Sequence, residues 1–195
     1  MANINMKPSK YMYNLLHVLP AFIDEEKGIV NTVLEISAGT LNKYEIITES
    51  GQLKLDRVGY SSLAYPVAYG AIPGTLDGDG DAIDVLIANV TEPLVAGCLV
   101  EARIIGIMKF EDSGEMDDKV IAVLSDDKRM DHIKKLEDLG EHIIKETQHY
   151  FEHYKDLKKP GLCKVLGFFD TAEAVKIIKE CEERYTKDYL PKFEE

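Results

Sequence analysis

The feature that most constrains this chain is an acidic stretch, Asp77-Gly-Asp-Gly-Asp-Ala-Ile-Asp84, which places four carboxylates within eight residues. The apolar run Val85-Leu86-Ile87 follows it directly and is typical of a buried strand. Like charges packed this closely repel one another and disfavour a compact state unless a cation lies between them. Carboxylate oxygens are hard ligands, so the stretch predicts a site for Mg²⁺, Mn²⁺ or Ca²⁺ rather than for zinc.

Two other interpretations compete for this stretch. Asp and Gly both suit turns, so a solvated acidic turn stays open when these eight residues are considered alone. An EF-hand calcium loop would place Asp77, Asp79 and Asp81 at its first, third and fifth positions. That loop requires Gly and Glu where the chain has Ala82 and Ala88, so the EF-hand is excluded.

Composition bounds the class of protein. A chain of 195 residues suits one domain, and a content of 45% hydrophobic and 30% charged residues excludes disordered and membrane proteins. The formal charge of −12 argues against nucleic acid or an anionic membrane as a partner. An anionic substrate would therefore need metal cations to mediate its binding.

The cellular compartment is predicted from the cysteines and the N-terminus. The chain has three cysteines and no C-x-x-C pair, which favours a reducing compartment. Lys7 and Lys10 precede an apolar run in the manner of a signal peptide, but Asn14 and His17 interrupt that run and no cleavage site of small residues follows. We expect a cytoplasmic protein.

Residues 1–28 show no clear period and are expected to form an irregular or partly helical lead-in to a single domain over residues 29–195. From residue 29 a period of two predicts short strands. Gly106 lies inside the longest of them and suggests a bulge. The predicted strands are residues 30–36, 43–48, 53–58, 85–90, 98–110 and 120–124, with the second and third forming a hairpin.

Two charged residues share a face with apolar ones on these strands. Arg57 has the parity of Leu53 and Leu55, and Glu35 has the parity of Val33, so each charge could lie at the end of an inward face. The alternative is that each side chain escapes to solvent at the strand end. Residues 61–73 are expected to be a loop, and residues 112–119 a second acidic connection between strands.

Apolar residues at three- and four-residue spacing predict a helix over residues 136–154. A second helix is predicted to begin at Asp170, a good N-cap residue with Glu173 three positions on. Several strands followed by helices indicate an α+β domain with a mostly antiparallel, barrel-like sheet.

The first predicted helix also carries His149-Tyr-Phe-Glu-His153, which matches the inverted zinc-protease signature H-x-x-E-H. A zinc hydrolase is therefore one hypothesis. The favoured interpretation is that the two histidines face solvent or a neighbouring subunit, because the sequence identifies no third zinc ligand.

The combination of motifs is more specific than its parts. Asp79-Gly-Asp81-x-x-Asp84 is preceded by Tyr65-Pro-x-x-Tyr69-Gly and followed by a loop with further acidic residues and a lysine. In this order the motifs resemble those of the soluble family I inorganic pyrophosphatases. The resemblance runs over residues 31–178 and includes Lys43-Tyr-Glu45, Asp56-Arg57 and Phe151-Glu-His-Tyr-Lys-Asp156.

The resemblance implies a fold and an activity. It implies a five-stranded OB-like β-barrel flanked by C-terminal helices, and hydrolysis of diphosphate to two phosphates. It also implies several Mg²⁺ ions per site, with Mn²⁺ as a substitute, and a homo-oligomer that in bacteria is often a hexamer.

The resemblance further implies a role for individual residues. Asp81 would accept the proton of the attacking water, Tyr69 would support the site, and Glu45 would lie one layer behind it. The implied metal ligands are Glu35, Asp79, Asp84, Asp112 and Asp117. The implied phosphate-binding residues are Lys43, Arg57, Lys119, Tyr154 and Lys155.

The sequence departs from the family pattern at several positions. Ala82 replaces the usual proline, Ala68 the usual asparagine and Ala71 an aromatic residue, and no tryptophan is present near Leu162. None of these changes removes a ligand. They bear on the rigidity of the acidic loop, so the alternative hypothesis is a catalytically weak, pyrophosphatase-like binding protein.

Overall fold

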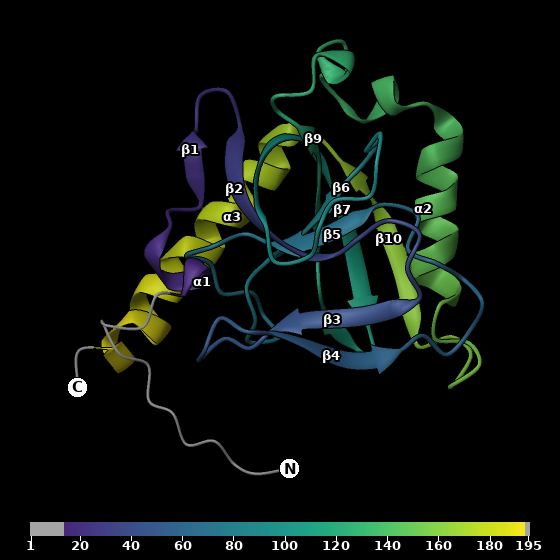
Figure 1. Ribbon diagram of the computed structural model, residues 1–195, viewed down its shortest axis with the longest axis horizontal. Coiled ribbons are helices and arrows are strands. Elements are labelled where there is room, and N and C mark those ends of the chain that lie inside the picture. The colour runs from purple at the N-terminus through teal and green to yellow at the C-terminus, as the bar shows by residue number, and fades with distance from the viewer. Residues whose placement is uncertain (1–13, 194–195) are drawn as a thin grey trace.

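The computed structural model describes residues 14–193, and its centre is a closed ring of five strands (Figure 1). Each strand of the ring is paired with the next, and β2 also pairs with β7, which closes the ring. Four of the pairings are antiparallel, and the β6–β9 pairing is parallel. The strands, in order around the ring, are β2 (Ile29–Ile36), β5 (Ala68–Ala71), β6 (Asp84–Ile87), β9 (Lys119–Leu124) and β7 (Leu99–Asp112).

Three further strands extend this mixed sheet. β1 (Phe22–Asp24) pairs with β2, while β8 (Glu115–Met116) and β10 (Cys163–Phe169) pair with β7. The hairpin of β3 (Asn42–Ile46) and β4 (Leu53–Val58) forms a separate two-stranded sheet. In Figure 1 this hairpin lies across one end of the ring.

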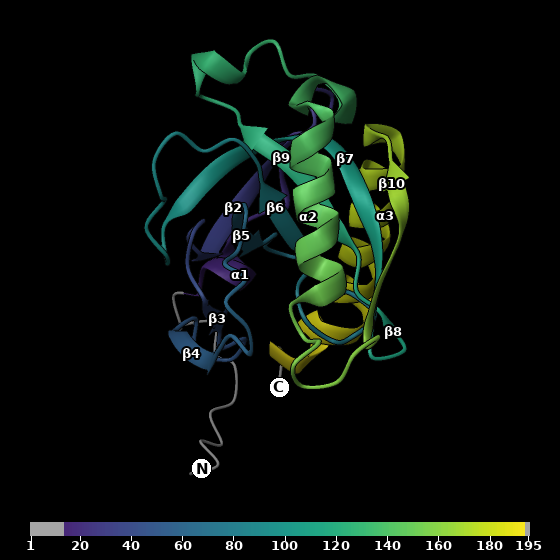
Figure 2. The ribbon, with the colours of Figure 1, turned by 90° about the vertical axis from the view of Figure 1, so that its right-hand side faces the viewer.

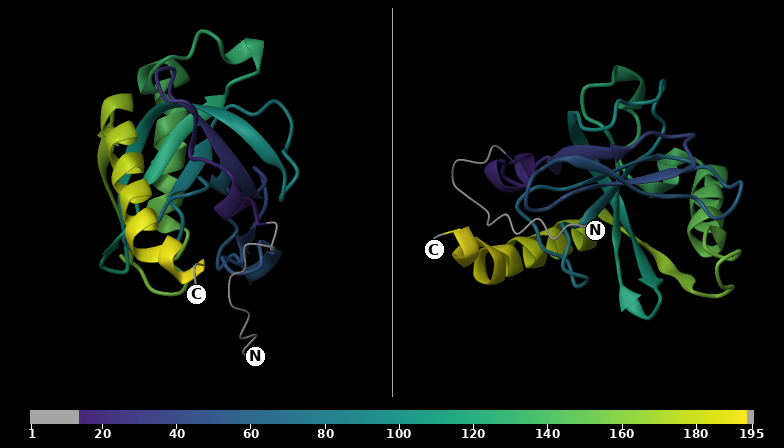
Figure 3. Two further views of the ribbon diagram at one scale, coloured as in Figure 1. Left: turned by 90° about the vertical axis from the view of Figure 1, so that its left-hand side faces the viewer. Right: turned by 60° about the horizontal axis from the view of Figure 1, so that its bottom comes forward.

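Two helices cover opposite sides of the sheet. Figure 2 shows α2 (Glu141–His153) in front of the strands, and the left view of Figure 3 shows α3 (Thr171–Arg184) on the other side. Successive residues of a strand point to opposite faces, so Val85 packs in the cluster under α3 and Leu86 in the cluster under α2. Because both faces are covered, the apolar run that follows the acidic stretch is buried on both sides.

The remaining short elements lie at the termini and before α2. They are α1 (Leu15–Val18), the 3-10 helices η1 (Lys128–Met130), η2 (Leu136–Leu139) and η4 (Leu190–Phe193), and the π-helical turn η3 (Tyr185–Tyr189).

The structure confirms the six predicted strands, the mostly antiparallel sheet and the register shift at Gly106, where β7 pairs with β9. The Asp170 side chain accepts a hydrogen bond of 3.0 Å from the Glu173 backbone N–H, which confirms the predicted start of α3. The predicted single helix over residues 136–154 is wrong. Gly140, with φ of +89°, separates the 3-10 turn η2 from α2, because this backbone conformation cannot continue an α-helix.

Four strands were not predicted: β1 in the lead-in, β8 in the acidic connection, and β5 and β10. The segment expected to be a loop, residues 61–73, contains β5, and β10 precedes α3 without a predicted counterpart. The expectation of an inward face on β4 is also wrong, since Leu53 and Leu55 are exposed. Residues 1–13 of the predicted lead-in lie outside the described residues, and its remainder contains α1 and β1.

A substitution at Gly70 tests how closely β5 packs against β2 in the ring. It pairs with Leu34 of β2, and a Cβ added at Gly70 would lie 2.4 Å from the Val33 carbonyl oxygen. We expect Gly70→Ala to lower the free energy of unfolding by about 1–3 kcal/mol, as other overpacked substitutions do. Urea unfolding measures this loss. The control is Gly78→Ala, whose Cβ would meet nothing closer than 3.8 Å, and an equal loss in both variants would contradict the close approach.

Candidate active site

A hollow of about 340 Å³ lies between the ring and the β3–β4 hairpin, and it is lined by most of the predicted acidic residues. The ring supplies Glu35 from β2, Tyr69 from β5 and Asp84 from the first position of β6. The hairpin supplies Lys43 and Glu45 from β3. The loops before β6 and β9 supply Asp79, Asp81 and Asp117.

Lys119 lies at the inner end of this site. It is the first residue of β9, pairs in register with Asp84 across the parallel strands, and is 2% exposed. Its ammonium group donates hydrogen bonds to both Asp84 and Asp117. The Tyr69 hydroxyl donates a further hydrogen bond to Asp84. A single buried cation therefore bridges two of the predicted metal ligands.

The acidic loop has its own hydrogen bonds. The Asp77 N–H donates to the Asp81 carbonyl at 2.6 Å, and the Asp79 carboxylate accepts a bond of 3.1 Å from the Asp81 N–H. These bonds leave the side chains of Asp79 and Asp81 exposed at the hollow. Asp77 instead turns away and forms an ion pair of 3.0 Å with Arg184. Three of the four carboxylates in the stretch thus face the site, and the fourth anchors the loop.

The buried carboxylates hold more negative charge than the lysines balance. Burial and the charge of Asp84 raise the pKa of Glu35 to about 8. Burial raises the pKa of Asp84 to about 7, although Lys119 opposes the shift. Burial alone would lower the pKa of Lys119, but Asp84 and Asp117 outweigh it and raise that pKa. Carboxylates with pKa values raised in this way favour a bound cation, because the cation would lower those pKa values.

Asp81 differs from its neighbours. Its side chain reaches solvent, yet the surrounding protein and the charge of Asp79 raise its pKa above the usual range. Its carboxylate accepts a hydrogen bond from no lysine among the described contacts, and it forms none of the ion pairs that occupy Asp84 and Asp117. A carboxylate with a raised pKa and a free face is suited to accept a proton.

A second cluster lies beside the first. The Asp112 carboxylate accepts hydrogen bonds from Lys155 and, at 3.2 Å, from the Tyr154 hydroxyl. Burial would raise the pKa of Asp112, but the Lys155 contact outweighs it and lowers that pKa. Arg57 is half-buried, pairs with Asp56 at 2.6 Å and lies 5.7 Å from the centre of the Tyr60 ring. These residues do not line the hollow, so the structure divides the predicted site into an acidic and a more basic part.

The donor set fits a hard divalent cation, because all the predicted ligands are carboxylates. Among residues 14–193, no three His, Cys, Asp or Glu side chains are assembled closely enough to form a metal cluster as they stand. At the acidic site the physical reason is that Lys119 occupies the space between Asp84 and Asp117.

The histidine pair of α2 does not form a zinc site in the described part of the chain. The rings of His149 and His153 lie 4.6 Å apart on the exposed face of the helix, and His153 bonds to Asp156 at 2.8 Å. No third ligand joins them within residues 14–193. This supports the predicted solvent-facing position of both histidines.

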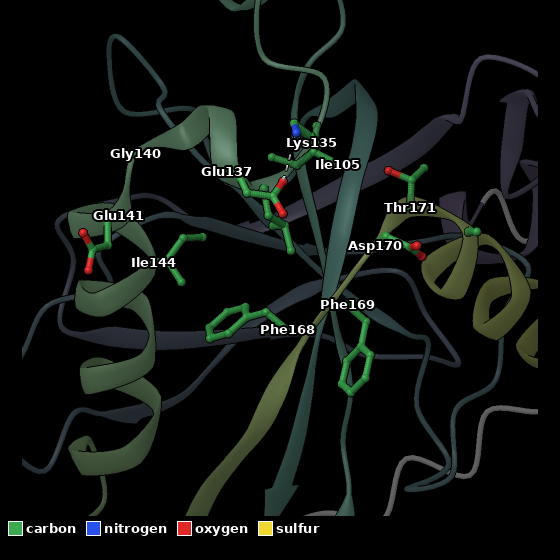
Figure 4. Close-up of a pocket in the computed structure, with 12 residues that line it drawn as sticks. Ile105, Lys135, Glu137, Gly140, Glu141, Ile144, Phe168, Phe169, Asp170 and Thr171 are labelled. Carbon is green, nitrogen blue, oxygen red and sulfur yellow. Dashed lines mark ion pairs between the residues drawn. The ribbon is translucent and has the colours of Figure 1, made fainter.

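A larger hollow of about 620 Å³ lies between η2, α2 and the start of α3 (Figure 4). Its lining includes Ile144, Phe168 and Phe169; in Figure 4 the Phe168 ring extends toward α2, whereas the Phe169 ring points away from it. It contains none of the predicted site residues. No helix of residues 14–193 is long and apolar enough to cross a membrane.

Sequence reasoning missed several residues that line the acidic hollow, among them Thr48 and Glu49 of the β3–β4 turn. Lys54 of β4 pairs with Glu45 across the hairpin, and Leu16 of α1 lies at the hollow's edge. The period of two could have identified Lys54, since it lies opposite Glu45 once the hairpin register is known. No local signal in the sequence identifies Leu16.

Comparisons with known proteins identify the family of this chain. A model of the family described as inorganic pyrophosphatase matches residues 32–186. The chain belongs to the inorganic pyrophosphatase family. The protein named inorganic pyrophosphatase from Neisseria meningitidis serogroup B is 48% identical over 84% of this chain and 93% of that protein. The one from Geobacillus stearothermophilus is 44% identical over 83% of this chain and 97% of that protein.

Solved pyrophosphatase structures share the fold. The crystal structure of the Neisseria gonorrhoeae enzyme is 43% identical, with a TM-score of 0.84 over 89% of this chain and 99% of that one. The Thermus thermophilus structure gives 41% identity and a TM-score of 0.82, with the same coverage. The mixed sheet with its ring of five strands and C-terminal helices is therefore that of inorganic pyrophosphatases.

The raised pKa of Glu35 predicts how the stability of the metal-free pyrophosphatase depends on pH. Its pKa rises from 4.5 to about 8 on folding, so between these values the folded protein binds a proton that the unfolded chain has lost. The contribution of Glu35 to the free energy of unfolding is therefore present at low pH. It is lost as pH rises, by up to about 1.4 kcal/mol per pH unit. We expect Glu35→Gln to gain stability relative to wild type as pH rises from 5 to 8, measured by urea unfolding in EDTA.

The matched control for Glu35→Gln is Glu152→Gln on α2, a partly buried glutamate outside the hollow. The free energies of unfolding of wild type and Glu35→Gln should therefore differ by an amount that changes with pH. A constant difference across this pH range would contradict the buried, charge-repelled state of Glu35.

Proposed function

We propose that this protein hydrolyses inorganic diphosphate to two phosphates, with Mg²⁺ as the cofactor and Mn²⁺ as a substitute. The observation that carries the proposal is the convergence of seven carboxylates with Lys43 and Tyr69 in one hollow, where the ammonium of Lys119 pairs with two of the carboxylates. A diphosphate is highly anionic, so bound divalent metal would neutralise its oxygens and lower the pKa of a water that attacks phosphorus. Family membership at 48% identity supports this activity.

The acidic residues would hold the metal ions. Asp84 and Asp117 already lie on either side of one cation, the ammonium of Lys119. The proposed ligands are Glu35, Asp79, Asp84, Asp112 and Asp117. Tyr69 would keep Asp84 oriented through its hydrogen bond, and Glu45 would orient Lys43, with which it forms an ion pair.

The basic residues would hold the phosphates. Arg57 offers a fork of donors to phosphate oxygens, whereas a lysine acts as a point charge. The proposed phosphate-binding residues are Lys43, Arg57, Lys119, Tyr154 and Lys155. Their charge would stabilise the negative charge that moves onto the leaving phosphate. Asp81 would accept the proton of the attacking water, in keeping with its raised pKa.

We also propose the finer features that the family resemblance implies. The five-strand ring would be an OB-like barrel, with residues 29–195 as the catalytic domain and residues 1–28 as a lead-in. The protein would be a cytoplasmic homo-oligomer, with a hexamer as the first state to test by light scattering.

Chelation tests the reaction class. We expect Mg²⁺-supported release of phosphate from diphosphate, and its loss in excess EDTA, because metal-activated water is the proposed nucleophile. Restored Mg²⁺ should restore the rate. The control is alkylation of thiols, which should leave the rate unchanged. A rate that survives EDTA would reject the metal-dependent mechanism, and no turnover with Mg²⁺ would favour the alternative, a catalytically weak binding protein.

Two carboxylates three residues apart should respond differently to neutralisation. Asp84→Asn removes a charged ligand, so part of the lost rate should return at higher Mg²⁺. Asp81→Asn removes the proton acceptor, and its loss, on the order of 10²- to 10⁴-fold, should persist at saturating Mg²⁺. The measurement is rate against Mg²⁺ concentration, with circular dichroism to check folding. Full rescue of the Asp81 variant by metal would make Asp81 another ligand.

A further inference from the structure

Two terminal segments of this chain meet beside the acidic loop. α1 precedes the region that the family model matches, residues 32–186, and Tyr189 follows it, with Tyr185 at its last turn. Figure 1 shows α1 against the end of the chain's final helical run, and a contact between His17 and Tyr185 joins the two. The contact therefore joins a segment that precedes the matched region to the end of that region.

His17 joins three segments at this point. Its Nε2 lies 2.7 Å from the Thr48 carbonyl oxygen in the β3–β4 turn, and its Nδ1 lies 2.7 Å from the Tyr185 hydroxyl. A carbonyl only accepts, so Nε2 carries the proton and Nδ1 accepts from Tyr185. The ring also stacks on Tyr185 and Tyr189, at centroid distances of 5.8 and 5.0 Å. Burial lowers the pKa of His17 and favours this neutral form.

The same segments contact both arms of the acidic loop. The Gly74 N–H donates to the Leu16 carbonyl at 2.9 Å. On the opposite arm, Gly80 and Ala82 line a narrow space of about 10 Å³. The other walls of that space include Leu16, His17, Tyr185 and Tyr189. A space this small leaves the loop little room to move toward the termini.

The loop needs such outside support. It contains Gly78 and Gly80, and glycine gives up more backbone freedom on folding than any other residue. Its carboxylates repel one another, and its internal hydrogen bonds are few. Arg184 fixes the start of the loop through the Leu76 carbonyl at 2.9 Å and Asp77 at 3.0 Å. His17 and the tyrosines lie where the loop turns back toward β6.

We propose that α1 and the π-helical turn η3 form a clasp that positions the acidic loop and the β3–β4 turn for metal binding, with His17 as its central positioning residue. The inference rests on the proposed function, because the loop carries the proposed ligand Asp79 and the proposed base Asp81. Leu16 of the clasp packs in the same apolar cluster as Ala82. Ala82 is the residue that this chain has where the family pattern has proline, so the clasp acts at that position of the loop.

The test compares three variants with wild type. His17→Ala removes both hydrogen bonds and the stack. Tyr185→Phe keeps the ring and removes only the hydroxyl that His17 contacts. The control is His142→Ala, a histidine on α2 whose side chain is 83% exposed.

Two readouts do not depend on activity. The first is Mn²⁺ binding to the metal-free protein, followed by electron paramagnetic resonance of free Mn²⁺, which gives affinity and stoichiometry separately. The second is hydrogen exchange of peptides that span residues 74–83, without metal. We expect His17→Ala to weaken Mn²⁺ binding by about 10-fold at unchanged stoichiometry, as residues behind metal ligands do. Exchange in residues 74–83 should become faster, Tyr185→Phe should be intermediate, and His142→Ala should match wild type.

Different results would overturn the clasp and the proposed function. A lower stoichiometry at unchanged affinity would show a merely structural role and overturn the clasp, as would wild-type exchange and affinity in His17→Ala. If His17→Ala does not fold, Tyr185→Phe decides by the same criteria. A wild type that binds Mn²⁺ without hydrolysing diphosphate would reject the proposed function, whereas the exchange measurement, which needs neither metal nor substrate, would still decide the clasp.

Discussion

The rest of the site depends on one buried cation, the ammonium of Lys119, and on the strand pair that holds it. β6 and β9 are the parallel pair of the ring, and their register puts Asp84 directly beside Lys119. An unpaired ammonium at 2% exposure would be strongly unfavourable, so Asp84 and Asp117 must lie where they do for the fold to form. The fold and the chemistry thus share one requirement, the opposition of these charges at one end of the ring.

The excess of carboxylates around that pair gives the site its character. Burial and the nearby carboxylates raise the pKa values of Glu35 and Asp84, although Lys43 and Lys119 oppose these shifts. Such a site disfavours an anion by itself and favours an anion that arrives with cations. The second cluster, with Lys155 and Arg57, lies outside the hollow and supplies the positive side that an anionic substrate requires.

The sequence predicts much of this arrangement because the signals are local. The acidic stretch, the period of two before it and the N-cap at Asp170 each predict a feature that the structure contains. β5 could not be predicted from its own residues, because Ala68-Tyr-Gly-Ala71 is made a strand by the two neighbours that bury it. The burial of Glu35 is likewise a tertiary effect, since parity alone left its side chain free to reach solvent.

The role of Asp77 shows the same limit within the acidic stretch. Spacing treats its four carboxylates alike, and only the position of Arg184, more than a hundred residues away, separates the anchor from the others. The family and its activity followed from ordered motifs along the chain. The individual roles of the site residues stay predictions, since they depend on a substrate and metals.

The separate β3–β4 sheet has a mechanical consequence. The hairpin carries Lys43, Glu45 and Arg57, yet no strand of the ring pairs with it. The Ile46 N–H donates to the Glu35 carboxylate at 2.8 Å, so a side chain of the site itself links the two sheets. The hairpin and the ring are therefore joined through a carboxylate of the site, so a change in the charge of Glu35 acts directly on the contact between the two sheets.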